Sequence, residues 1–485
     1  MSSNLQKWWQ NRMHGAGVAA AERARVRLAA HPWPESLLSA VRRLQDGDAQ
    51  AYLVGGTVRD VLRGREGGGS FDVATSLVPE QVRERFERVA PTGIEHGTVL
   101  ILDGPVPIEC TTFRREGRYS DARRPDQVVF TDDPLADLDR RDLTVNAIAF
   151  DPSSGRLLDP HDGARDLERR RLRAVGDPLD RFREDGLRPL RVARFAATLE
   201  LEPDQDLLTA LGRLGDPDSG YSAGGVALER VRDELEKMMV AERPSIGFEL
   251  LRSAGLLALW LPELDRCRGV PQNRYHAYDV YFHCLYTCDA APAAKPLVRW
   301  AALLHDIGKP DTRVEREGEG TFYNHQFVGA TQVERLLERL RFAGDVRDAV
   351  VHLVREHMFD YRRTWSDAAL RRWLRHVGPE HVADLFDLRI ADLLGNGLKQ
   401  GFPFYLDEMR ERIETLIAAA AVLRVTDLAV DGNDVMRELG IAPGPEVRAV
   451  LEGLLEEVLD HPERNRRPNL LERLRQRRAV RASQA

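Results

Sequence analysis

Two kinds of hydrophobic pattern divide the chain. Between residues 50 and 115, short apolar and β-branched runs bounded by Gly, Pro and Asp predict strands at 52–54, 70–75, 99–102 and 106–114. Farther along, the apolar positions follow a helical period. A strand–helix–strand unit followed by a hairpin turn at Asp103-Gly104 favours a small mixed sheet flanked by helices. The pattern therefore predicts an α+β fold in which a small mixed-sheet head precedes an all-α remainder.

Helices are predicted where a helical pattern follows a start signal. In and before the head they span 19–30, 34–44 and, led by Pro79, 79 to about 89. A later amphipathic helix spans 228–239. Pro189 lies inside another helical pattern and is expected to kink it.

Composition narrows the class of protein. The chain has 485 residues, 30% charged and 43% hydrophobic, which indicates a soluble globular protein, and its length suggests roughly three domains. No apolar run approaches the roughly 18 residues that a membrane span needs. Residues 1–17 lack the apolar core of a signal peptide. Among the four cysteines, only Cys284-x-x-x-Cys288 has a spacing that would allow a metal-type pair, and these two, one helical turn apart, are expected to be reduced core thiols instead. We therefore expect a cytoplasmic protein without a membrane partner. Its net charge of −7 still allows local basic patches that bind RNA.

The first candidate for chemistry is the pair Gly55-Gly56, which ends one predicted strand and begins a helix carrying Arg59. Glycines let the backbone approach a triphosphate, and a helix start with an arginine supplies positive potential. Asp72, in the next strand, offers a carboxylate for Mg²⁺. Two glycines alone are a weak signal because many turns contain them.

The stretch LVGGTVRDVLRGR followed by FDVATS resembles the tRNA nucleotidyltransferase and bacterial poly(A) polymerase family, within the polymerase-β-like nucleotidyltransferases. That family carries Asp-x-Asp where this chain has Ser70-Phe71-Asp72. Because residues 70 and 72 of a strand face the same side, Ser70 removes one of two metal-bridging carboxylates. We expect weakened or absent transfer unless another carboxylate, such as Glu66 across the Gly-rich loop, replaces it.

Glu109 lies mid-strand among apolar and β-branched residues, where burying an unpaired carboxylate is costly. An outward-facing strand residue is the alternative. The family places its Glu-x-Thr-Thr-Phe-Arg strand beside the Asp-x-Asp strand, which implies that Asp72 and Glu109 are catalytic and hold Mg²⁺. The charged segment 114–124 resembles the family's flexible loop, which influences nucleotide choice.

Residues 137–149 resemble the family's D-L-x-R-R-D-F/L-T-I/V-N-A motif. Arg141 is expected to reach a triphosphate, with Asp142 bracing it and Asn146 bonding a ribose or a loop. Residues 228–239 resemble the E-R-x-x-x-E-L stretch, expected to brace the neck without taking part in chemistry.

Residues 182–196 resemble the family's E-D-x-x-R motif, which selects CTP and ATP without a nucleic-acid template. Asp185 and Arg188 are expected on neighbouring turns of one helix face. The carboxylate accepts from the amino group of cytosine or adenine while the guanidinium donates to the ring. The alternative is a helix face of ion pairs. The full implied nucleotide-binding set is Gly55, Gly56, Arg59, Arg141, Asp142, Asn146, Asp185, Arg188, Arg191 and Arg194.

A His followed by a His-Asp pair, after an apolar helical run, resembles the HD phosphohydrolase superfamily. Its H…HD…D set is His283, His305, Asp306 and Asp392, a ligand mix suited to a divalent metal. His325 and His357 fall where some HD proteins have additional ligands. The alternative is a relic fold in which these residues only hydrogen-bond in a helical core.

The resemblance implies five parts: an N-terminal extension at 1–34, a nucleotidyltransferase head at 35–165, a helical neck for nucleotide selection at 166–245, an HD domain at 246–396 and a helical RNA-binding tail at 397–485. The tail would contact the tRNA elbow. Its arginine-rich end suits phosphate contacts or, equally, a solvated helix face.

The leading hypothesis is template-independent addition of CMP and AMP, from CTP and ATP, to the tRNA 3′ end with Mg²⁺. Narrower variants are a CC-adding enzyme, an A-adding enzyme or a poly(A) polymerase, the last disfavoured by the acidic net charge. Hypotheses of other classes are a metal-dependent HD phosphohydrolase and a tRNA-binding protein with a degenerate polymerase site.

Overall fold

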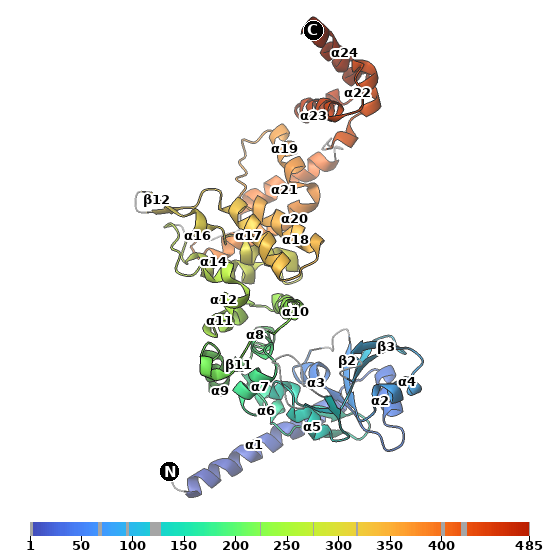
Figure 1. Cartoon of the computed structure of the whole chain (residues 1–485), viewed down its shortest axis with the longest axis vertical. Coiled ribbons are helices and arrows are strands. Elements are labelled where there is room, and N and C mark those ends of the chain that lie inside the picture. The colour runs from blue at the N-terminus through green and yellow to red at the C-terminus, as the bar shows by residue number, and fades with distance from the viewer. Residues whose placement is uncertain are drawn as a thin grey trace. The chain divides into compact units, whose positions relative to one another are not determined.

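The computed structural model describes residues 3–65, 70–93, 97–116, 128–223, 225–274, 276–316, 319–398, 403–418 and 424–484 (Figure 1). It divides into two compact units. Unit 1 comprises Met1–Asp265 with Glu338–Phe342, and unit 2 comprises Arg266–Leu337 with Ala343–Ala485. None of the described helices has both the length and the hydropathy to cross a bilayer.

Unit 1 contains a seven-stranded mixed sheet in the order β3-β4-β5-β2-β1-β8-β9. The central strand, β2, runs parallel to its neighbour β5, and the other neighbouring pairs are antiparallel. The strands are β1 (Ala51–Val54), β2 (Phe71–Thr75), β3 (Val89–Gly93), β4 (Thr98–Ile101), β5 (Ile108–Thr112), β8 (Ala149–Asp151) and β9 (Arg156–Leu158). The mixed-sheet head and the α+β class are therefore confirmed.

Both faces of the sheet are covered, which explains why all four residues of β1 are buried. Leu53 packs into one core with residues of α1 (Ser3–Ala30), α2 (Glu35–Leu44) and α3 (Gly55–Leu62). Tyr52 and Val54 point the other way, as strand alternation requires, into a smaller core with Phe113 and Leu138. Figure 1 shows α2, α3 and α4 (Pro79–Arg85) beside the strands.

The remaining elements of unit 1 are short strands and helices that follow or flank the sheet. They are β6 (Arg114–Glu116), β7 (Val128–Phe130), α5 (Pro134–Asp139), η2 (Thr144–Asn146), α6 (Gly163–Glu168), β10 (Arg171–Leu172), α7 (Pro178–Glu184), α8 (Arg188–Leu199), β11 (Glu202–Pro203), α9 (Gln205–Gly212), η3 (Pro217–Ser219), α10 (Leu228–Met239), α11 (Ser245–Ser253), α12 (Leu257–Trp260) and α13 (Pro262–Asp265).

Unit 2 is helical apart from one small hairpin. Its elements are α14 (Val280–Ala290), α15 (Pro296–Leu304), α16 (Lys309–Thr312), β12 (Val314–Arg316), β13 (Glu319–Thr321), α17 (His325–Arg339, which ends in unit 1), α18 (Gly344–Glu356), α19 (Asp367–Val377), η4 (Pro379–His381), α20 (Val382–Gly395), α21 (Phe404–Ala418), η5 (Val425–Asp427), α22 (Gly432–Leu439), α23 (Pro445–Asp460), η6 (Pro462–Arg464) and α24 (Arg467–Gln484).

Several local predictions need correction. The kink expected at Pro189 is wrong: α8 begins at Arg188, so Pro189 occupies its first turn, where no intrahelical N–H bond is lost. The helix led by Pro79 ends at Arg85 because β3, which was not predicted, begins at Val89. Glu66 and residues 117–124 of the expected flexible loop lie outside the described residues. The five-part division stays a prediction.

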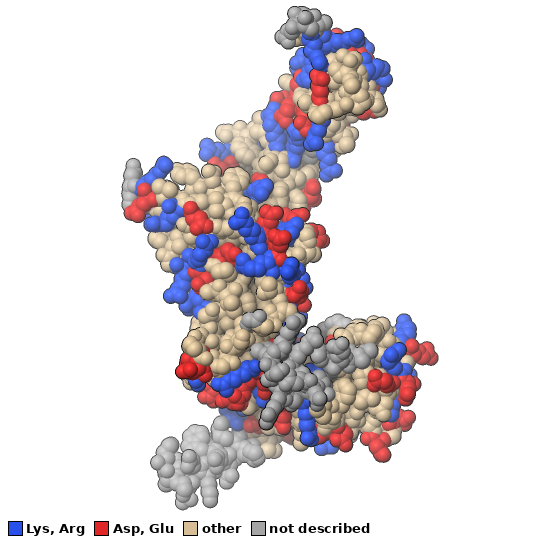
Figure 2. Space-filling view, in the orientation of Figure 1, with Lys and Arg blue, Asp and Glu red and all other residues tan. Residues whose placement is uncertain are grey.

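The four cysteines are buried and free, in agreement with reduced core thiols. In the tail, the arginines expected to meet phosphate mostly pair with acidic residues. Arg467 lies 2.6 Å from Asp434, and Arg473 and Arg477 lie 2.7 and 2.8 Å from Glu457. Figure 2 shows acidic side chains among the basic ones on the visible face of the tail. These contacts favour the interpretation of a structural, ion-paired helix face over a dedicated phosphate surface.

Candidate active site

The centre of the site is a pair of carboxylates on neighbouring strands. Asp72 of β2 and Glu109 of β5 are direct register partners in the parallel pair, so their side chains leave the sheet on the same side. Burial raises the pKa of both groups, and the charge of Asp72 raises that of Glu109 further. A pair of neighbouring carboxylates whose ionised forms are disfavoured in this way suits a shared divalent cation.

The two glycines bring a helix start directly onto Asp72. The Gly56 N–H donates to Asp72 Oδ2 at 2.9 Å, and the Asp72 N–H donates to Thr57 Oγ1 at 2.7 Å. Gly55 has φ +58°, and a Cβ at either glycine would lie 3.1 Å from Asp72 Oδ2. Only glycine combines this backbone conformation with so close an approach at position 55.

Both carboxylates line a cavity of about 610 Å³. Among the described residues, nine cationic side chains line it, against four carboxylates, in a chain whose net charge is −7. Such a concentration of guanidinium groups suits a polyanion such as a triphosphate. The charged lining residues are Arg59, Arg114, Arg140, Arg141, Arg188, Arg191, Arg194, Arg230, Lys237, Asp72, Glu109, Asp142 and Asp185.

The expectation that Asp142 braces Arg141 is wrong. Arg141 instead pairs with the buried Asp137, one helical turn earlier, at 3.0 Å. Asp142 accepts from Arg191, whose Nη2 lies 2.7 Å from Oδ2. Adjacent residues of the motif leave the chain in different directions at the end of α5, so neighbours in sequence take separate partners. Burial would raise the pKa of Asp142, but the charge of Arg191, hydrogen bonding and other basic neighbours hold it well below its usual range.

Asn146 joins this network to the helix that follows the glycines. Its Oδ1 accepts from Arg59 Nη1 at 2.7 Å, and its Nδ2 donates to Asp142 Oδ1 at 3.1 Å. The backbone carbonyl of Asn146 accepts from Arg141 at 3.1 Å. Asn146 therefore fixes three charged side chains at the cavity wall.

Asp185 and Arg188 were expected on one helix face, and this expectation is wrong. Asp185 follows the end of α7, and Arg188 is the first residue of α8. Among the described residues, Arg188 donates to Glu184 and to backbone carbonyls of Arg181 and Arg140, while Asp185 pairs with Arg230. Both side chains nevertheless line the same cavity.

The helix α10 supplies residues whose place in the site was not predicted from the sequence, although two of them, Arg230 and Glu234, belong to its E-R-x-x-x-E-L pattern. Glu234, which is buried, lies 3.0 Å from Arg194 and 3.7 Å from Arg191. Burial lowers the pKa of Arg194 to about 10 despite that carboxylate. Arg230 and Lys237 of the same helix face the cavity. The bracing role expected of this helix is thus accompanied by direct contributions to the site, which its E-R-x-x-x-E-L pattern alone did not indicate.

Ser70 is exposed, immediately before β2, and is absent from the residues that line the cavity. The side chain that replaces the first carboxylate of Asp-x-Asp therefore adds no ligand to the described lining.

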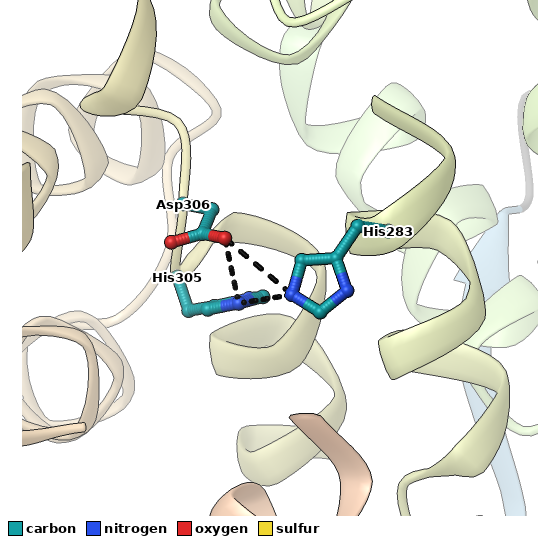
Figure 3. Close-up of side chains that lie close together, drawn as sticks. All are labelled: His283, His305 and Asp306. Atoms are coloured by element: carbon teal, nitrogen blue, oxygen red, sulfur yellow. Dashed lines mark hydrogen bonds and ion pairs between the residues drawn. The ribbon is translucent and has the colours of Figure 1, made fainter. Parts of the chain in front are cut away.

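A second group of candidate ligands lies in unit 2. Figure 3 shows His283, from α14, pointing at His305 and Asp306, which follow α15. His283 Nε2 is 3.5 Å from Asp306 Oδ2 and 3.1 Å from Asp392 Oδ1, and His305 Nε2 is 3.1 Å from Asp306 Oδ2. All four expected residues thus converge, and the first three form a buried group that could hold a metal ion.

Asp306 belongs to a second such group with His325 and His357. Its Oδ1 lies 3.2 Å from His325 Nε2 and 3.9 Å from His357 Nε2, whereas its Oδ2 faces His283 and His305. Burial lowers the pKa of His357 to about 3, which leaves a neutral imidazole suited to ligation. One carboxylate therefore stands between two sets of imidazoles.

Comparison with known protein families assigns three segments of the chain. Three family models match: "Poly A polymerase head domain" at residues 51–173, "Probable RNA and SrmB- binding site of polymerase A" at 225–268 and "HD domain" at 273–421. The expected resemblance is thereby confirmed.

Whole-length relatives agree. The chain is 31% identical over 438 residues to the CCA-adding enzyme of Lactococcus lactis subsp. lactis, covering 89% of this chain and 95% of the relative. It is 32% identical over 427 residues to that of Streptococcus gordonii, covering 88% and 93%. The crystal structure of the Bacillus stearothermophilus CCA-adding enzyme in complex with CTP matches with a TM-score of 0.67 at 25% identity, covering 93% of this chain and 99% of that one. The chain therefore belongs to the family of CCA-adding enzymes, which are nucleotidyltransferases.

Proposed function

We propose that this protein adds CMP and AMP, taken from CTP and ATP, to the 3′ end of tRNA without a nucleic-acid template. The observation that carries the proposal is a single basic cavity that joins the Asp72–Glu109 pair to Asp185 and Arg188. The family membership of the whole chain supports it.

In this proposal the residues divide the work along the cavity. Arg59, Arg141, Arg191 and Arg194 bind the triphosphate, helped by the backbone of Gly55 and Gly56. Asp185 and Arg188 receive the base. The tRNA 3′ hydroxyl attacks the α-phosphate in line, and pyrophosphate leaves.

Asp72 and Glu109 fit Mg²⁺, since two oxygen ligands in strand register face the same side. When bound there, Mg²⁺ supplies charge stabilisation at the transferring phosphoryl group and lowers the pKa of the attacking hydroxyl. The protein itself contributes the strand register of β2 and β5, which fixes how these two carboxylates lie relative to each other.

The test is incubation of the purified protein with Mg²⁺, tRNA that lacks its 3′ CCA, and labelled CTP or ATP, with products resolved to single nucleotides. Ordered addition of C, C and A is the expected result. Addition of C alone, or of A only to a CC end, would make this a partial enzyme, and long A tracts a poly(A) polymerase. A protein that binds tRNA yet incorporates nothing would contradict the proposal.

We also propose a second activity, metal-dependent phosphoester hydrolysis by the HD domain. Two buried ligand groups that share Asp306 favour it over a relic core. The test is hydrolysis of phosphomonoesters and cyclic phosphates with added divalent metals, compared between the wild-type protein and an Asp306→Asn variant. Equal rates in the two proteins would leave the HD domain without this activity.

A further inference from the structure

The carboxylate of Asp185 is held by an arginine from a distant part of unit 1. Arg230 of α10 places Nη2 at 2.8 Å from Asp185 Oδ2 and Nη1 at 3.4 Å from Oδ1. The two residues are 45 positions apart. Both residues line the cavity. The side chain of Asp185 is 19% exposed and that of Arg230 is 40% exposed, so the pair lies at the wall that nucleotides reach.

The backbone around Asp185 is also clamped. Asp185 Oδ1 accepts from the Leu187 N–H at 3.0 Å. Tyr221 donates its hydroxyl to the Gly186 carbonyl at 2.9 Å. A Cβ on Gly186 would lie 2.5 Å from the Ser222 carbonyl oxygen, so this turn packs directly against the segment before α10. The turn cannot shift toward that segment, and the direction of the Asp185 side chain is set largely by Arg230.

The number of hydrogen-bond acceptor sites that Asp185 has left determines which base groups it can bind. A carboxylate offers about four lone-pair sites. Among the described residues, Leu187 and Arg230 Nη1 use Oδ1, and Arg230 Nη2 uses one site of Oδ2. One acceptor site on Oδ2 remains for a ligand, which suits a single amino group.

We infer that Arg230 is a specificity-determining positioning residue that acts through Asp185. By holding the carboxylate in one orientation, it leaves one acceptor for the amino group of cytosine or adenine. The carbonyl oxygen of uracil or guanine at the same place meets a fixed, like-signed oxygen and finds no donor there. This inference rests on the proposed function, because it assigns Asp185 to the base.

The test measures equilibrium dissociation constants of CTP and UTP for the full-length protein, so that it does not depend on transfer. The readout is the ratio of the two constants, which an inactive fraction of protein does not alter. We expect Arg230→Met to reduce the preference for CTP by roughly tenfold or more, the scale of one hydrogen bond to a charged group. Arg230→Lys, which keeps the charge without the two-pronged contact, should fall between Met and wild type.

Arg232→Met is the matched control, since Arg232 lies on the same helix, pairs with Asp233 and is not among the described residues that line the cavity. Its CTP preference should equal that of the wild type. Asp185→Asn should lose the preference, and adding Arg230→Met to it should change the ratio by no more than about twofold, because the arginine acts only through that carboxylate.

This inference alone would be overturned if the CTP preference survived Arg230→Met. It would also be overturned if Arg230→Met reduced the preference as much in the Asp185→Asn protein as in the wild type. Failure of the wild-type protein to bind CTP at all would instead overturn the proposed function on which it rests.

Discussion

Asp142 and Arg191 form an ion pair that joins two motifs 49 residues apart. Arg191 Nε and Nη2 lie 2.8 and 2.7 Å from Asp142 Oδ2, and Asp142 Oδ1 accepts from Asn146. The pair connects the end of the sheet-containing head to α8. It positions Arg191 at the cavity while leaving Arg141 to Asp137.

Replacing Asp142 by Asn should therefore destabilise unit 1. The change keeps the shape of the side chain but removes the closest carboxylate partner described for Arg191, whose next ion-pair partner, Glu234, lies 3.7 Å away. We expect the free energy of unfolding to fall by about 3 kcal/mol, as when one partner of a buried pair is removed. Urea denaturation followed by circular dichroism measures it. Asp139→Asn, at an exposed position, is the control and should leave the transition in place. Equal stability of Asp142→Asn and wild type would show that the pair does not connect these elements energetically.

Ser70→Asp should increase Mg²⁺-dependent nucleotide incorporation. A carboxylate at position 70, directly before β2, would restore the Asp-x-Asp pattern and add negative charge close to the proposed metal ligand Asp72. We expect the rate to rise by roughly tenfold or more. The measurement is single-nucleotide extension of tRNA at several Mg²⁺ concentrations. Ser70→Asn is the control, because it adds bulk without charge. An unchanged rate in Ser70→Asp would remove Ser70 as an explanation for weak transfer.

Asp72→Asn and Glu109→Gln should each lower incorporation by at least about a hundredfold, because each removes a proposed metal ligand at the transferring phosphate. CTP binding should persist, since the arginines that line the cavity are unchanged. Extension assays and equilibrium binding together separate these effects. The matched control is Glu84→Gln on the exposed side of α4. If either site variant retained wild-type extension, its carboxylate would not belong to the reaction.

The shared position of Asp306 predicts the metal content of the HD domain. His283→Ala and His357→Ala should each remove part of the bound divalent metal, and Asp306→Asn should remove nearly all of it, since this carboxylate belongs to both ligand groups. Elemental analysis of protein equilibrated with metal gives the stoichiometry. His376→Ala, at an exposed histidine, is the control. A variant with unchanged metal content would exclude its residue as a ligand, and tRNA extension should be normal in all of these proteins.

Much of the fold and of the candidate site could be predicted from the sequence alone. The periods of the hydrophobic pattern predicted the mixed sheet and the helices after it, because strand and helix periodicities are local properties of the chain. Glycine at positions 55 and 56 and carboxylates at 72 and 109 indicated the centre of the site, because few other residue types suit a backbone approach to phosphate or a Mg²⁺ ligand there.

Only the tertiary structure decided which charged residues are partners. Asp142 is adjacent in sequence to Arg141 but pairs with Arg191, and Asp185 pairs with Arg230 although Arg188 is three residues away. The C-terminal arginines likewise pair with acidic residues of the preceding helices. Ionic contacts act over a few ångströms in space, and their partners depend on how helices far apart in sequence pack together. A motif therefore identifies the groups that a site contains, whereas packing determines the direction in which each group points and the acceptors it leaves open.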